Sequence, residues 1–100
     1  MSVNFSQFDA SSVIILKRLA QHFPSPTEIG FNNVFPDYGT ETNKRAAHIG
    51  TIAFLRHEDF IAHDIGSVSS FILTKKGLAL FDEDIFKHLT DLLNSEAYSI

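Results

Sequence analysis

The stretch Leu55–Asp64, LRHEDFIAHD, gathers two histidines, one glutamate and two aspartates within ten residues. These side chain types bind metals and carry out acid–base chemistry. Zinc hydrolases of the HExxH type place the second histidine four residues after the first, because one face of a helix then aims both imidazoles at the metal. Here the residue four positions after His57 is Ile61, so the spacing of that motif is absent.

The two histidines of this stretch are predicted to lie on different elements. His57 falls at the end of a helix, whereas His63 falls in a short strand, where alternation turns His63 and Asp64 to opposite faces. We therefore interpret the stretch as a solvated helix end followed by an exposed hairpin. The sequence predicts neither a metal site nor a bound cofactor here.

The motifs of common enzyme classes are missing from the chain. It contains no G-x-S-x-G turn, no phosphate-binding P-loop and no G-x-G-x-x-G motif. It also contains no cysteine, which excludes a disulfide framework, a thiolate zinc site and a cysteine nucleophile. We predict a protein that is not an enzyme.

The length and composition favour one domain spanning residues 1–100. Ten phenylalanines supply large side chains for a single core. The chain has no apolar run of the roughly 18–20 residues that a membrane span requires. The start, MSVNFSQFDASS, lacks a basic segment followed by an apolar one, so we expect no signal peptide and a cytoplasmic location.

The net charge of −4 lies at the C-terminal end. Residues 1–80 carry as many basic as acidic side chains, whereas residues 81–100 carry Lys87 alone against five acidic side chains. A strongly acidic protein would argue against a nucleic-acid partner. The neutral first part of the chain permits DNA binding without requiring it.

The first half of the chain predicts a helix followed by a broken segment. A helix beginning at Ser11, capped by Asp9 or Ser11 and ended by Pro24 and Pro26, follows from the start and stop signals. After it we expect a short extended piece at 27–29 and a helical turn at 32–35. The apolar face of the helix is predicted from five residues: Val13, Leu16, Leu19, Ala20 and Phe23.

The second half predicts a long helix, a hairpin and a last helix. The long helix spans 42–59, with Thr40 or Thr42 as its cap and Ile52 and Leu55 on its buried side. Segments 60–64 and 69–74 predict two strands joined by the turn IGSVS. Thr74 then caps a single amphipathic helix over 75–94, whose stripe is Leu78, Phe81, Ile85, Leu89 and Leu92.

This element order resembles the winged helix-turn-helix superfamily, most strongly over Gly50–Leu80. The segment looks like that of many small bacterial winged-helix regulators and of short prophage proteins. In such proteins an LT..G element closes the wing, here Leu73, Thr74 and Gly77. The resemblance implies an α+β winged helix-turn-helix: a three-helix core, a β-hairpin wing and an additional C-terminal amphipathic helix at 81–100.

The resemblance implies double-stranded DNA as a partner and a transcriptional regulator as the function. The long helix would enter the major groove, and its first turn would then offer Asn and Arg for reading bases and Lys for a phosphate. The resemblance also implies a homodimer formed through the C-terminal helix. The DNA-binding candidates are Thr42, Asn43, Lys44, Arg45, Arg56 and Lys75.

A module that contacts another protein instead of DNA is the alternative. If Ile52 and Leu55 point inward, the opposite face of the long helix is small and apolar, which suits a protein surface better than phosphates. The predicted wing also lacks basic residues, since neither lysine nor arginine occurs from His57 to Ser70. The candidate residues of this protein contact are Ala46, Ile49, Gly50 and Ala53.

Overall fold

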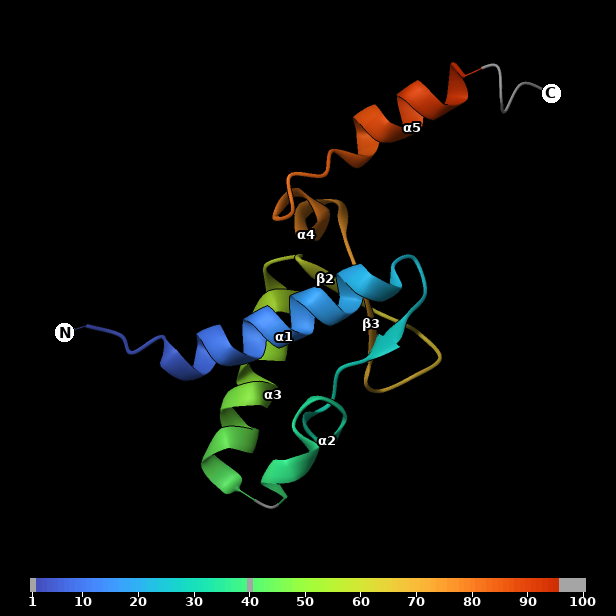
Figure 1. Ribbon diagram of the computed structural model, residues 1–100. Helices are drawn as coiled ribbons and strands as arrows, with labels where there is room; N and C mark the ends of the chain where they lie inside the picture. Colours follow the sequence, from blue (N-terminus) through green and yellow to red (C-terminus); the bar gives the residue numbers. More distant parts are fainter. Residues whose placement is uncertain (1, 40, 96–100) are drawn as a thin grey trace.

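The computed structural model describes residues 2–39 and 41–95 and shows an α+β fold, in which several helices surround a small antiparallel sheet (Figure 1). Its elements, in chain order, are α1 (Ser6–His22), β1 (Thr27–Glu28), α2 (Phe31–Val34), the 3-10 turn η1 (Pro36–Tyr38), α3 (Thr42–His57), β2 (Ile61–His63), β3 (Ser70–Leu73), α4 (Lys75–Ala79) and α5 (Ile85–Leu93).

The sheet has three strands in the order β1-β3-β2, and both pairings are antiparallel. The hairpin predicted from the sequence is confirmed, with Ile61 opposite Leu73 and His63 opposite Phe71. The short extended piece predicted near residue 27 is also confirmed. It joins the far side of β3, where Thr27 pairs with Phe71.

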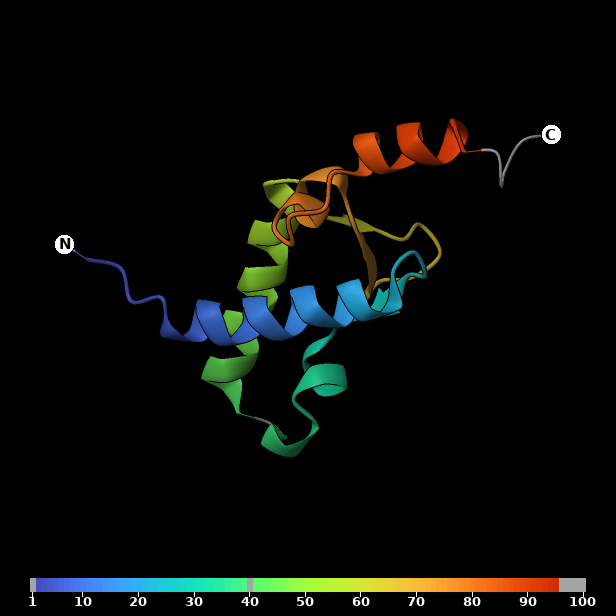
Figure 2. The same cartoon turned by 45° about the horizontal axis from the view of Figure 1, so that its top comes forward.

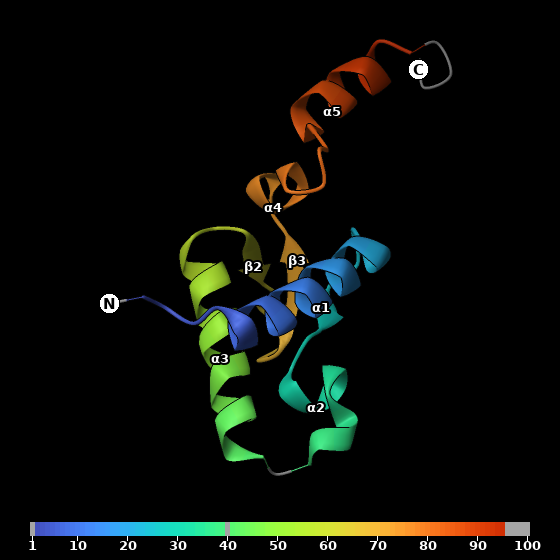
Figure 3. The same ribbon diagram turned by 60° about the vertical axis from the view of Figure 1, so that its left-hand side comes forward.

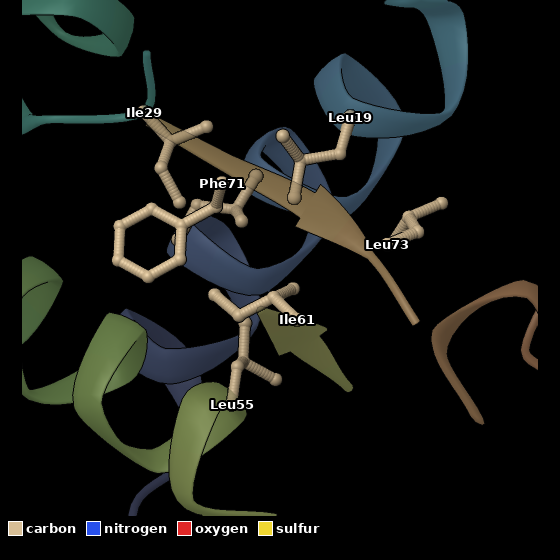
Figure 4. Packing of buried hydrophobic residues seen from close by; sticks show 7 residues of the cluster. Leu19, Ile29, Leu55, Ile61, Phe71 and Leu73 are labelled. Carbon is tan, nitrogen blue, oxygen red and sulfur yellow. The ribbon is translucent and has the colours of Figure 1, made fainter. Parts of the chain in front are cut away.

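The core lies where α1 crosses α3 and the sheet (Figures 1 and 3). Because each of these elements has one apolar face, they bury those faces against one another. Figure 4 shows side chains from all of them pointing into the same volume. The buried cluster is Ile15, Leu19, Ile29, Leu55, Ile61, Phe71 and Leu73.

The first helix begins five residues earlier than predicted, at Ser6 instead of Ser11. Asp9 and Ser11 are therefore inside the helix and do not cap it; the first amide, that of Ser6, donates to Asn4 Oδ1 at 2.9 Å. The extra turn is stabilised by the ring of Phe8, which packs edge-on against Phe54 of α3. The predicted end before Pro24 is confirmed.

The buried face of α1 is centred on Ile15 and includes Leu19 of the predicted stripe, with Leu16 and Ala20 packed against it. Val13 and Phe23, two members of that stripe, are 51% and 37% exposed. Ser11 lies on the buried face because its hydroxyl bonds to a buried histidine of α3. A pattern based on apolar residues alone misses this position.

Helix α3 is continuous, as predicted, but it ends at His57 and not at residue 59, where Asp59 takes a positive φ of 65°. Leu55 is buried, as predicted, whereas Ile52 is half-buried. Thr42 is its first helical residue and not its cap; Glu41 occupies the cap position, and no side chain of the cap accepts a hydrogen bond there. The alternative cap, Thr40, lies outside the described residues.

The single helix predicted over 75–94 is wrong: α4 and α5 replace it. The chain leaves α4 through a tight turn in which Asp82 takes a positive φ of 59°. The Asp84 side chain then accepts from the Lys87 amide at 3.0 Å and so starts a new helix. Aspartate favours such caps and turns over helix interiors, which explains the break. Residues 96–100 of the predicted C-terminal helix lie outside the described residues.

The predicted roles of Thr74 and Gly77 agree with the geometry at the start of α4. The Thr74 hydroxyl accepts from the Gly77 amide at 3.1 Å and donates to the carbonyl of Asp59. A Cβ atom at position 77 would lie 2.1 Å from the backbone oxygen of Phe60. Only glycine fits where α4 packs this closely against the turn after α3.

Candidate nucleic-acid interface

Helix α3 turns one face to the core and the opposite face to solvent, as its periodicity predicts. Leu55 and His48 are buried on the inner side. The four residues proposed for a protein contact are all exposed on the other side of the helix: Ala46, Ile49, Gly50 and Ala53.

A buried histidine fixes the position of α3 relative to α1 and β1. His48 Nε2 lies 2.7 Å from the carbonyl oxygen of Ile29, and Nδ1 lies 3.0 Å from the hydroxyl of Ser11. Because a carbonyl can only accept, Nε2 carries the proton and Nδ1 of the neutral ring accepts from Ser11.

Burial lowers the pKa of His48 below its ordinary value of 6.5, and the bond to the carbonyl of Ile29 opposes this shift in part. The ring also meets Phe31 and Phe35 edge-on, with centroids 5.9 and 5.4 Å away. Sequence reasoning missed His48. The spacing could have indicated its burial, because His48 lies one helical turn before Thr51 and two turns before Leu55, on the same side of the helix.

The basic residues in the first turn of α3 pack against aromatic rings. Lys44 Nζ lies 4.2 Å from the ring centroid of Tyr38. The Arg45 guanidinium lies 5.0 Å from the centroid of Phe31 and donates to Asn32 Oδ1 at 3.0 Å. Both side chains are therefore half-buried and held in one direction, along α2 and η1. The preceding Thr42 and Asn43 are exposed.

The other two predicted DNA contacts lie at the opposite end of α3. Arg56 is exposed about 16 Å further along the helix axis than Arg45, at a rise of about 1.5 Å per residue. Lys75 is exposed at the start of α4, which packs against the turn that follows α3. The six candidates thus form two groups, one at each end of α3.

The loop of the β2–β3 hairpin exposes two apolar side chains. Ile65 is 100% exposed and Val68 is 92% exposed. A groove of about 300 Å³ separates this loop from α3, with Arg45, Ile49 and Val68 among its lining residues. The groove therefore connects Val68 of the loop to Ile49 at the edge of the outer face of α3.

The histidines of the stretch Leu55–Asp64 lie on separate elements, as predicted. His57 is exposed at the end of α3, with Nε2 3.9 Å from Glu58 Oε2. His63 is not exposed, contrary to expectation: it is half-buried in β2, with its ring 4.8 Å from that of Phe71. Within residues 2–39 and 41–95, no group of three or more His, Asp or Glu side chains could hold a metal ion.

In the same described residues, no helix has both the length and the apolar character needed to cross a membrane. Comparisons with protein-family models, with curated proteins and with solved structures find no match to this chain.

Proposed function

We propose that this chain is a winged helix-turn-helix protein that binds double-stranded DNA as a transcriptional regulator. The order of helices and strands, with a three-stranded sheet β1-β3-β2 ending in a hairpin beside α3, supports this fold. In this arrangement α2 and α3 form the helix-turn-helix, and the β2–β3 loop is the wing.

The observation that carries the proposal is the distribution of side chains along the outer face of α3. Its middle holds Ile49, which is 56% exposed, and the small residues Ala46, Gly50 and Ala53, which allow the helix backbone to approach the base pairs closely. Basic groups lie at the two ends, with Lys44 and Arg56 about 18 Å apart along the helix axis. The major groove is about 12 Å wide, so the two ends can reach phosphates on both of its sides.

Each candidate then has a role that matches its chemistry. Asn43 is exposed and suits an adenine edge, whereas Arg45, fixed by Asn32 and Phe31, suits a guanine edge. Lys44, Arg56 and Lys75 neutralise phosphates. Alanine in the middle of the helix suits the methyl group of thymine.

Fluorescence polarisation with a labelled random-sequence duplex tests this proposal. At about 50 mM salt, where phosphate contacts are strongest, we expect micromolar or tighter binding that weakens steeply as salt rises. Arg56→Gln and Lys75→Gln should each reduce the slope of log affinity against log salt by about one. Lys17→Gln on α1 removes the same charge elsewhere and should leave the slope unchanged. Absence of binding at about 50 mM salt would overturn the proposal.

A second candidate function is contact with another protein through the same surface. The specific observation in its favour is the exposure of Val68 across a groove from Ile49, on a loop that carries no basic residue. Exposed apolar side chains of this kind are typical of surfaces that bind protein and not phosphate.

Val68→Lys separates the two functions because its expected effects have opposite signs. A cation on the wing should tighten DNA binding and increase its salt dependence if DNA is the partner. It should weaken capture of a protein partner in a pull-down if the apolar surface is the contact. Since Val68 is 92% exposed, the substitution leaves the fold intact. Ala53→Arg, on the outer face of α3, should likewise abolish protein capture.

A further inference from the structure

Helix α5 is strongly amphipathic, yet none of its residues is buried. It packs on α4 and leads away from the rest of the molecule (Figures 1 and 2). Phe86 and Leu93 are 70% and 80% exposed, and Leu89 is 48% exposed. The radius of gyration, 16.0 Å, exceeds the value of about 13 Å expected for a compact domain of this length. The apolar stripe of α5 therefore contributes nothing to the core of its own chain.

We propose that α5 binds α5 of a second copy of this chain, with the two helices antiparallel and Leu89 on the two-fold axis. This inference rests on α5 and its surroundings and is independent of DNA binding. It names the contact residues of the dimer and the direction in which the helices pair.

The order of side chains along α5 is the first argument for a second copy as the occupant. A two-fold interface must be self-complementary, so that each residue meets a suitable residue when the helix is reversed. Reversal about Leu89 places Ile85 opposite Leu93 and Phe86 opposite Leu92. The stripe is thus apolar at the same positions in both directions.

The helix geometry keeps charge out of this contact. At 100° per residue, the five apolar side chains of α5 fall within one arc centred on Leu89, and Lys87 and Asp91 fall on the far side. Lys87 Nζ and Asp91 Oδ2 already pair within the chain at 2.9 Å. Lys75 of α4 is exposed at the edge of the stripe, with Nζ 6.0 Å from the ring centroid of Phe86. Pairing of the stripes therefore buries no charge of α5 itself.

The acidic residues before α5 select the antiparallel direction. Asp82, Glu83 and Asp84 are all exposed. In a parallel pair the two acidic runs would lie side by side and repel each other, because like charges a few ångströms apart are unfavourable. In an antiparallel pair they lie at opposite ends of the interface.

A groove at the N-terminal end of α5 extends the proposed contact. A groove of about 420 Å³ lies between the end of α1, α4 and the start of α5, and its apolar lining includes Phe23, Phe81 and Ile85. Antiparallel pairing brings the partner's helix end, at Leu93, next to Ile85 and so to this groove. The groove provides apolar surface that α5 itself leaves uncovered.

Analytical ultracentrifugation of the full chain tests the pairing. We expect a concentration-dependent dimer at about 100 µM, as suits a micromolar dissociation constant. Leu89→Glu should yield a monomer, and its melting curve at low protein concentration should match that of the wild type, since Leu89 lies outside the core. Val13→Glu is the matched control, because Val13 is exposed to nearly the same extent, 51% against 48%, and should keep the dimer.

Cysteine cross-linking tests the direction, because the chain has no cysteine of its own. In an antiparallel pair Leu89→Cys forms an intermolecular disulfide on mild oxidation. Ile85→Cys alone does not, because its two copies lie about 12 Å apart along the axis, beyond the reach of a disulfide. A mixture of Ile85→Cys and Leu93→Cys chains does form one. Cross-linking of Ile85→Cys with itself would overturn the antiparallel arrangement, and a wild-type monomer at about 100 µM would overturn the dimer.

Discussion

Helix α3 and the segment Lys75–Leu93 look alike in the sequence but end up in different situations. Each has apolar residues at helical spacing, and each was predicted to be one amphipathic helix. Helix α3 is continuous, buries Leu55 and half-buries Ile52. The other segment divides into α4, which packs against the core, and α5, which buries nothing.

The difference lies in what is opposite each stripe. The inner face of α3 meets α1 and β2, so Leu55 is enclosed on all sides. Leu78 of α4 still reaches the core cluster, but Leu89 of α5 lies beyond it. A hydrophobic stripe therefore predicts which side of a helix will be buried. Only the fold shows whether that side is buried by the same chain.

A first large effect should distinguish a glycine of α4 from a glycine of α3. Gly77→Ala should destabilise the protein by about 3 kcal/mol, because the new Cβ would meet the backbone oxygen of Phe60 at 2.1 Å and force α4 away. Gly50→Ala in α3 meets nothing within 4 Å and should stabilise the protein by about 0.5–1 kcal/mol. Urea denaturation measures both. Equal effects would show that α4 is not held closely against the turn.

A pair of leucine substitutions tests the comparison directly. Leu55→Ala in α3 should cost about 2–5 kcal/mol, because it removes side chain volume from a core position that is 3% exposed. Leu89→Ala in α5 should change the stability of the dilute monomer by about 0.5 kcal/mol or less. The measurement is denaturation at low protein concentration, so that self-association does not contribute. A large loss with Leu89→Ala would place α5 in the core of its own chain.

The smallest expected effect is a pH dependence that arises in α3 and not in α5. Because the pKa of His48 is lowered in the folded protein, the unfolded chain takes up a proton first as the pH falls below about 6.5. Stability from the neutral ring is fully present above that pH and is lost below it, by at most about 1.4 kcal/mol per pH unit.

Denaturation at pH 8, 6 and 5 measures this effect. His48→Gln should lower stability at pH 8, since one of the two buried hydrogen bonds is lost, and should flatten the decline below pH 6.5. The control is His22→Gln, at an exposed histidine, which should keep the wild-type decline. If His48→Gln declined as steeply as the wild type, the ring would not be the group that titrates.

Features set by neighbouring residues could be predicted from the sequence. Pro24 ends α1, the turn after His63 makes a hairpin, and Thr74 caps α4, because each depends on bonds within a few residues. The small outer face around Gly50 was also predictable, since it follows from helical periodicity. The break at Asp82 was missed because a regular stripe continues through it.

Features set by distant residues could not be predicted. The bonds of His48 join it to Ser11 and Ile29, 37 and 19 positions away, and no local pattern specifies them. The same holds for the candidate site. The sequence placed Lys44 and Arg56 on one helix, but their packing and their separation from Lys75 depend on the fold.

The sequence by itself determined the order of most helices and strands and which side of α3 faces outward, because hydrogen bonds and periodicity act over a few residues. The tertiary structure decided that α1, α3 and the sheet share one core while the stripe of α5 stays exposed. The physical reason is that burial requires a second surface, and that surface comes from residues far away in the chain or from another chain.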